Sequence, residues 1–188
     1  MRIVFIGPPG AGKGTQSANM IRELGILHLS TGEMLRKAQQ EKTRLGRLAS
    51  DYINTGQLVP DPLILQLIGE RLVQPDCQRG YLLDGFPRTL GQAKALDEYL
   101  HQQGTPLDVV IELVVDEAEL TRRLSDRGRS DDNPEIIRQR LRSFQDQTRP
   151  LIRYYSDKGL MEAIDAIGTT EEVFQRIMQA IQRHTPTA

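Results

Sequence analysis

The sequence has few of the residues that mark a disulfide-rich, zinc-bound or membrane-spanning protein. Its 188 residues contain one cysteine and no tryptophan, and aromatic residues make up 5%. Cys77 alone can form neither an internal disulfide nor a four-thiolate zinc site, so we expect no structural zinc and a reducing compartment. No apolar run is long enough for a membrane span or a secretory signal. These absences predict a cytoplasmic protein without a membrane partner.

Charge of one sign is also lacking. The formal net charge is -1, which argues against a protein that coats nucleic acid. Lysine is scarce, because the 24 basic residues comprise 19 Arg and 5 Lys. Arginine is preferred where planar oxyanions are bound through two hydrogen bonds, although compositional bias would give the same count. Any anion site must therefore be local.

Short apolar runs alternate with helical patterns along the chain. The expected strands are residues 3–6, 81–83, 109–115 and 161–164. The expected helices are residues 12–24, 32–39, 44–54, 62–73, 90–102, 117–126, 134–156 and 170–183. Strands that alternate with helices form parallel sheets. We therefore predict an α/β protein with a three-layer P-loop fold, in which helices cover both faces of a central parallel sheet.

The chain length suits one domain, residues 1–188. Residues 30–75 carry helix signals but no strand pattern, so we expect a helical excursion that can cover a ligand. Residues 127–133 have the composition of a loop, and Asn133-Pro134 predicts the start of the next helix through an N-cap followed by proline at the first helical position.

A glycine-rich segment, residues 7–15 (GPPGAGKGT), follows the first expected strand and opens the first expected helix. This is the context of a phosphate-binding loop. Its backbone N–H groups and the helix N-terminus favour phosphate oxygens, and Lys13 can reach the outer phosphates. The predicted triphosphate site comprises Gly10, Ala11, Gly12, Lys13, Gly14 and Thr15. The alternative is a glycine-rich turn with a solvated lysine.

Two further segments have residues suited to binding a second phosphate. Residues 30–36 (STGEMLR) fit a helix capping box, but they also place Arg36 one turn beyond the helix start, where it could join backbone donors around an anion. Asp84 ends an expected strand, and ligands bind at that end of open α/β sheets. There it could order a water bound to Mg²⁺, while Arg88 pairs with a phosphate.

These segments resemble the adenylate kinases, a branch of the nucleoside monophosphate kinase family of P-loop kinases. The resemblance rests on residues 7–15, where the hydroxyl comes at Thr15 rather than directly after Lys13, on residues 30–36, and on residues 84–88 (DGFPR). It implies a helical monophosphate-binding insertion at about residues 30–59. It also implies reversible in-line transfer between ATP and AMP, giving two ADP, by a monomer that uses Mg²⁺ near Thr15 and Asp84.

The resemblance also implies roles for individual residues. Gln92 corresponds to the residue that reads adenine, and Gly168 borders the adenine of ATP. The implied AMP-binding residues are Thr31, Arg36, Gln57, Leu58, Val59, Gly85, Phe86, Pro87, Arg88, Gln92, Arg129 and Arg140. The implied catalytic residues are Lys13, Asp84, Arg88, Arg127, Arg129 and Arg140.

Transfer between two nucleotides brings several negative charges together, so arginines should converge on the site. Arg127 and Arg129 resemble the lid arginines of the family, with Arg127 touching ATP, and the lid at about 127–133 is very short. A solvated turn and helix face is the alternative, and we prefer that interpretation for Arg138 and Arg142. The three histidines and Cys77 form no grouping that suggests a metal site or a nucleophile.

Two other functions fit parts of this sequence. A UMP/CMP kinase of the same family would share the transfer site and differ near Gln92. A P-loop switch protein would bind a triphosphate without transferring it, but it favours a hydroxyl directly after Lys13 and an Asn-Lys-x-Asp segment, both absent here.

Overall fold

The computed structural model describes residues 1–126 and 133–184, which fold around a five-stranded parallel sheet. The strand order is β2-β3-β1-β4-β5, and each neighbouring pair is parallel. The strands are β1 (Arg2–Ile6), β2 (Leu27–Ser30), β3 (Tyr81–Asp84), β4 (Val109–Val114) and β5 (Met161–Asp165). All five therefore end at the same edge of the sheet, where ligands bind in folds of this class.

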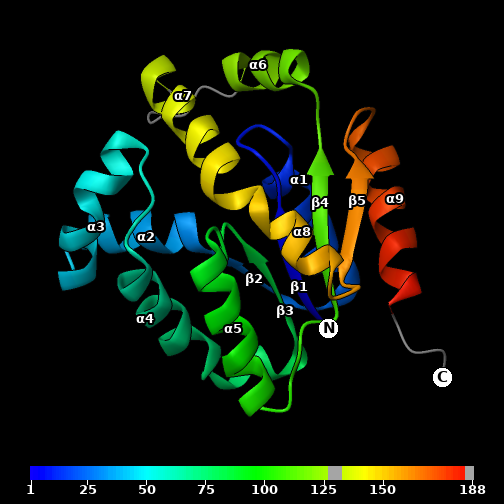
Figure 1. The fold of residues 1–188 in the computed structure, drawn as a ribbon, viewed down its shortest axis with the longest axis horizontal. Helices are drawn as coiled ribbons and strands as arrows, with labels where there is room; N and C mark the ends of the chain where they lie inside the picture. The colour runs from blue at the N-terminus through cyan, green and yellow to red at the C-terminus, as the bar shows by residue number, and fades with distance from the viewer. Residues whose placement is uncertain (127–132, 185–188) are drawn as a thin grey trace.

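Helices connect the strands and cover the sheet (Figure 1). They are α1 (Lys13–Leu24), α2 (Thr31–Gln40), α3 (Arg44–Thr55), α4 (Asp61–Leu72), α5 (Leu90–Gln102), α6 (Glu117–Asp126), α7 (Pro134–Ser143), α8 (Pro150–Ser156) and α9 (Thr170–Arg183), with a 3₁₀ segment η1 (Pro75–Arg79) and a π-helical segment η2 (Phe144–Thr148). In Figure 1, α2, α3 and α4 gather on the side of the sheet opposite to β5 and α9. No helix among the described residues has the length and apolar character needed to cross a membrane.

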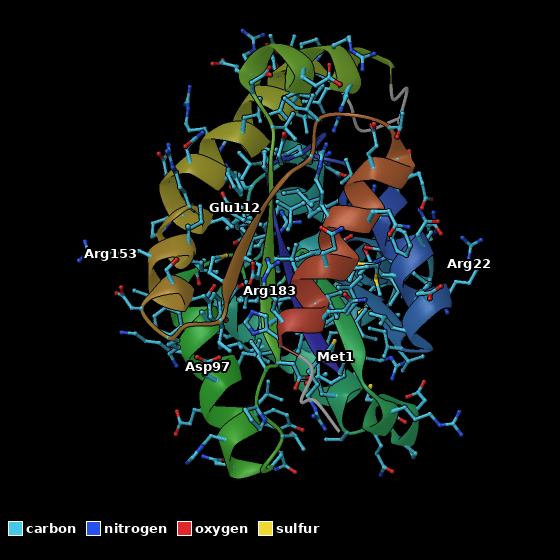
Figure 2. All side chains as sticks on the ribbon, turned by 90° about the vertical axis from the view of Figure 1, so that its right-hand side faces the viewer. Met1, Arg22, Asp97, Glu112, Arg153 and Arg183 are labelled. Carbon is cyan, nitrogen blue, oxygen red and sulfur yellow. The ribbon has the colours of Figure 1, made fainter. Side chains whose placement is uncertain are left out.

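Side chains alternate between two cores along β1. Val4 and Ile6 belong to a core shared with α5 and α8, whereas Ile3 and Phe5 belong to one shared with α1 and α9. The period of two places successive side chains on opposite faces of the sheet. Figure 2 shows Arg22 of α1 and Arg153 of α8 projecting on opposite sides of the molecule. The predicted three-layer α/β fold is thus confirmed.

Strand β2 corrects the sequence analysis, which placed no strand between the first expected helix and residue 81. Its four residues, Leu27–Ser30, pair only with β3 at the edge of the sheet. Leu27 and His28 are half-buried, and Leu29 and Ser30 are buried. So short a strand, with a histidine and a serine in it, lacks the continuous apolar run that reveals a buried strand. Because of β2, Ser30 and Thr31 arrive at the carboxyl edge of the sheet.

The single helix expected over residues 134–156 is also wrong, since α7 and α8 are separated by the π-helical turn η2. Pro150 has no backbone N–H to continue an α-helical ladder. The preceding N–H, that of Arg149, donates to the carbonyl of Phe144 at 2.8 Å, which closes the wider π turn. This turn aims the hydroxyl of Thr148 at the carbonyl oxygen of Arg88, 2.9 Å away.

The predicted start of α7 is confirmed. The side chain of Asn133 caps the helix by accepting a hydrogen bond from the backbone N–H of Glu135 at 2.7 Å, and Pro134 occupies the first turn.

Candidate active site

A cavity of about 880 Å³ opens at the carboxyl edge of the sheet. The segment after β1 lines one end, and residues from α2, α3, α5 and α7 line the other. The residues expected to bind nucleotide that line it are Gly10, Ala11, Gly12, Lys13, Gly14, Thr15, Thr31, Arg36, Gln57, Leu58, Val59, Asp84, Gly85, Pro87, Arg88, Gln92, Arg140 and Gly168. One continuous space therefore joins the predicted ATP and AMP sites.

The loop between β1 and α1 turns through two glycines in the left-handed region. Gly10 has φ 88° and Gly12, the N-cap of α1, has φ 95°. A Cβ atom at Gly10 would also lie 3.0 Å from Cγ of Leu124. The ammonium of Lys13 folds back to donate to the carbonyls of Gly7 at 2.7 Å and Pro8 at 3.1 Å. The loop thus presents an uncapped helix N-terminus and a cation at the same point, which suits phosphate oxygens.

Asp84 ends β3 between the two ends of the cavity. Its Oδ2 atom lies 3.5 Å from Nε2 of His28 on β2, at the outer limit of a hydrogen bond. Burial alone would raise the pKa of Asp84, but His28 and the charges of Lys13 and Arg88 together hold it below its ordinary value. The same contact raises the pKa of His28. Asp84 is therefore a carboxylate at neutral pH. Its neighbour His28 could not be predicted, because β2 has no strand pattern in the sequence.

Three of the predicted arginines converge on the far end of the cavity. Burial lowers the pKa of Arg88, and the nearby charges of Arg140 and Arg36 lower it further, while Asp84 raises it. The guanidinium of Arg36 folds over the first turn of α2, where a Cβ atom at Gly32 would lie 3.3 Å from its Nη1 atom. Cations held this close to one another favour a multiply charged anion between them.

The orientation of Arg88 is set from both sides. Its Nε atom donates to the carbonyl of Gly85 at 2.8 Å, and its own carbonyl accepts from Thr148. The Gly85 carbonyl also accepts from the hydroxyl of Thr31 at 2.9 Å. Gly85 has φ 81°, and a Cβ atom there would lie 2.8 Å from that hydroxyl, so the position requires glycine.

Gln92 is 2% exposed, at the start of α5. Its Oε1 atom accepts from the backbone N–H of Arg88 at 2.7 Å, and its Nε2 atom donates to Asp61 at 2.7 Å. A glutamine on an exposed helix face would be solvated, but the burial of Gln92 excludes this here.

Arg123 lies in the cavity but was absent from the predicted site. It donates to the carbonyls of Ala166 at 2.8 Å and Ala11 at 3.4 Å, and to Glu119 at 2.7 Å. It therefore ties the phosphate loop to the turn after β5. In the sequence it looks like any basic residue of a charged helix, and the Glu119 to Arg123 spacing was its one signal.

Gly168 lies in that turn with φ 124°, a conformation that favours glycine. The next residue, Thr169, caps α9 in a complete capping box with Glu172. Arg176 donates to the carbonyls of Asp165 at 2.8 Å and Ile167 at 2.7 Å. The turn is thus held rigid at the mouth of the cavity.

The remaining predictions have other outcomes. The side chain of Phe86 is fully buried in the core and does not line the cavity. Arg127 and Arg129 lie outside the described residues. Arg138 and Arg142 are exposed, as expected.

The described residues include no cluster of three or more His, Cys, Asp or Glu side chains that could hold a metal ion by itself. The carboxylate of Asp84 and the hydroxyl of Thr15 are among the oxygen atoms that line the cavity and could bind a metal ion. Mg²⁺ characteristically keeps several waters and takes one or two protein ligands beside substrate phosphates. The residues present fit an ion that arrives with a nucleotide.

A phosphate loop that shares one cavity with a second group of arginines defines a P-loop phosphotransferase. The model of the adenylate kinase family matches residues 5–160. The chain belongs to the adenylate kinase family.

Individual adenylate kinases are similar in sequence to this protein over nearly the whole chain. It is 50% identical over 186 residues to the adenylate kinase of Thermobifida fusca, covering 97% of this chain and 98% of the relative. It is 48% identical over 181 residues to that of Mycobacterium ulcerans and 45% identical over 181 residues to that of Mycobacterium tuberculosis, each covering 96% of this chain and 99% of the relative. Neither the UMP/CMP kinase nor the switch protein is favoured by these matches.

Proposed function

We propose that this protein transfers the terminal phosphoryl group of ATP to AMP, giving two ADP, by direct in-line transfer with Mg²⁺. The observation that carries the proposal is the single cavity that contains the phosphate loop at one end and Arg36, Arg88 and Gln92 at the other. A nucleotide at each end would bring two phosphate groups together beside Asp84.

On the donor side, the backbone N–H groups of the loop and the N-terminus of α1 hold the phosphates of ATP. Lys13 leaves the carbonyls of Gly7 and Pro8 and bonds the outer phosphates, where charge develops during transfer. Gly168 and Arg123 border the remainder of this nucleotide, and Arg127 adds a lid cation.

On the acceptor side, Arg36, Arg88 and Arg140 hold the phosphate of AMP in line with the donor. Thr31, Gly85, Pro87 and the backbone of residues 57–59 line the space for its nucleoside, and Gln92 reads its base. Arg129 completes the cage around the transferring group. Phe86 supports this segment from the core.

Asp84 and Thr15 are the groups that would hold Mg²⁺ near the phosphates, through water or the nucleotide. The ion supplies positive charge that stabilises the phosphate oxygens. Asp84 suits this role because its lowered pKa keeps it ionised at neutral pH.

Exclusion of water prevents loss of the phosphoryl group to hydrolysis. We assign this to two covers, the helical insertion at about 30–59 and the short lid at about 127–133. The family resemblance supports a cytoplasmic monomer that engages no membrane, and the near-neutral charge argues against binding of nucleic acid.

The test is an acceptor panel of AMP, UMP, CMP and GMP with ATP and Mg²⁺, in which ADP formation is measured for the wild type and Lys13→Met. We expect AMP to be the preferred acceptor and the variant to lose at least about a hundredfold in kcat, because a charge on the transferring group is left unpaired. Circular dichroism checks that the variant is folded. Preference for UMP or CMP, or full turnover by the variant, would contradict the proposal.

A further inference from the structure

The carboxylate of Asp61 links two helices at the acceptor end of the cavity. Asp61 begins α4, and its Oδ1 atom accepts from Nε2 of Gln92 at 2.7 Å. Its Oδ2 atom accepts from the hydroxyl of Thr89, the N-cap of α5, at 2.9 Å. Gly91 lets the carboxylate approach, because a Cβ atom there would lie 3.0 Å from Oδ2.

The hydrogen bonds of Gln92 to Asp61 and to Arg88 both require the same one of the two possible orientations of the Gln92 amide group. A carboxylate only accepts hydrogen bonds, so Asp61 requires the NH₂ group of Gln92 on its side. A backbone N–H only donates, so Arg88 requires the carbonyl oxygen of Gln92 on its own side. Turning the amide over would place two acceptors together at Asp61 and two donors together at Arg88, and each contact would leave buried polar groups unpaired.

These bonds use half of the amide's capacity. A carboxamide has two donor hydrogens and two acceptor lone pairs, so one N–H and one lone pair of Gln92 remain. The Watson–Crick edge of adenine offers an acceptor at N1 and a donor at its 6-amino group, which match that pair. Hypoxanthine offers the reverse, a donor at N1 and an acceptor at O6, and would need the amide turned over.

We propose that Asp61 is a positioning residue for acceptor specificity, which holds the Gln92 amide in the orientation that accepts adenine and rejects hypoxanthine. The inference rests on the proposed function, in which Gln92 reads the base of the monophosphate. Asp61 acts through Gln92 and contacts no reacting atom.

The test compares AMP with IMP as acceptors for the wild type, Asp61→Ala and Asp61→Asn, with ATP saturating. In Asp61→Ala, water replaces the carboxylate and can donate as well as accept, so only the N–H of Arg88 still opposes the turned amide, and turning it costs less than in the wild type. We expect the KM for AMP to rise about tenfold, from the loss of a charged hydrogen bond, with kcat and the KM for ATP within about twofold. The ratio of kcat/KM for IMP to that for AMP should rise at least about fivefold. Asp61→Asn keeps the shape of the side chain but can present an NH₂ group, so we expect a smaller rise in the same direction.

Glu171→Gln is the matched control. Glu171 also lies in the first turn of a helix and accepts a hydrogen bond from a glutamine amide, that of Gln175 at 2.6 Å, but Gln175 does not line the cavity, whereas Gln92 does. Its loss should leave the IMP to AMP ratio unchanged. A merely structural tie between α4 and α5 would lower stability in the Asp61 variants without changing that ratio.

The Gln92→Ala background separates this inference from the proposed function. If Gln92→Ala raises the KM for AMP and the further change Asp61→Ala adds nothing to it, Asp61 acts through Gln92. If Gln92→Ala raises the KM for AMP while both Asp61 variants keep the wild-type ratio, the inference about Asp61 is overturned and the acceptor site stands. An unchanged KM for AMP in Gln92→Ala would overturn both the base-reading role of Gln92 and this inference.

Discussion

At the scale of single residues, carboxylates orient side chains that line the cavity. Asp61 orients the amide of Gln92, and Glu119 orients the guanidinium of Arg123 with a hydrogen bond of 2.7 Å. The Oδ2 atom of Asp84 lies 3.5 Å from Nε2 of His28. A guanidinium or amide side chain has many rotamers, and a fixed acceptor selects one of them before the substrate binds.

The Glu119 carboxylate makes stability depend on pH. Hydrogen bonds from Arg122 and Arg123 lower its pKa from 4.5 to about 2. Since the pKa is depressed in the folded state, the stabilisation is complete above about pH 4.5 and is lost as the pH falls towards 2. We expect Glu119→Gln to lower the midpoint of urea unfolding at pH 7, and the difference from wild type to shrink between pH 4.5 and pH 2.

Glu117→Gln is the control for that measurement, because Glu117 lies in the same first turn of α6 and is exposed. It should change the midpoint little at any pH. A deficit of Glu119→Gln that stays constant down to pH 2 would count against the ion pairs as its cause.

At the scale of elements, the proposed acceptor cover depends on how closely α3 packs on α2. Gly46 is buried in α3, and a Cβ atom there would overlap the backbone carbonyl of Ala38 in α2. Its N–H also donates a hydrogen bond to the hydroxyl of Thr43, the N-cap of α3, at 3.0 Å. Because their backbones are in such close contact, we expect α2 and α3 to move together rather than separately.

The contrast between two helical glycines tests this packing. We expect Gly46→Ala to destabilise the fold by about 2 kcal/mol, since an added methyl group must push two backbones apart. Gly69→Ala in α4 meets nothing within 4 Å and should stabilise the fold by about 0.5–1 kcal/mol through helix propensity. Urea unfolding followed by circular dichroism measures both. Equal stabilities for the two variants would show that α2 and α3 are not in such close contact.

At the scale of the whole molecule, the cavity exists only when the segments that line it are assembled. Residues from the loop after β1, from α2, from the start of α5, from α7 and from the turn after β5 all contribute. A ligand that bridges them binds the folded state and not the unfolded chain, so it raises the free energy of unfolding.

The midpoint of thermal unfolding, Tm, should therefore rise when either ATP or AMP is added. ATP or AMP at about a hundred times its dissociation constant should each stabilise the protein by about 2.7 kcal/mol, and the two together by more than either alone. GMP at the same concentration as AMP should give a smaller shift. If ATP raises the Tm and AMP does not, the proposed assignment of the acceptor site is wrong.

Features that depend on neighbours along the chain could be predicted from the sequence. The phosphate loop of residues 7–15, the strand-ending Asp84 and the cap at Asn133 are each recognised within ten residues, because loop and helix-end geometry is set by local backbone preferences. The alternation of strands and helices was enough to predict the α/β class.

Contacts between residues far apart in the chain could not be predicted and are seen only in the folded protein. Asp61 and Gln92 are 31 positions apart, and Arg123 and Ala11 are 112 apart. Strand β2 is recognised only through its pairing with β3. The π turn is recognised only through the hydrogen bond from the N–H of Arg149 to the carbonyl of Phe144. Local patterns contain no record of such contacts, since a charged or amide side chain on a helix looks the same in sequence whether it faces solvent or a cavity.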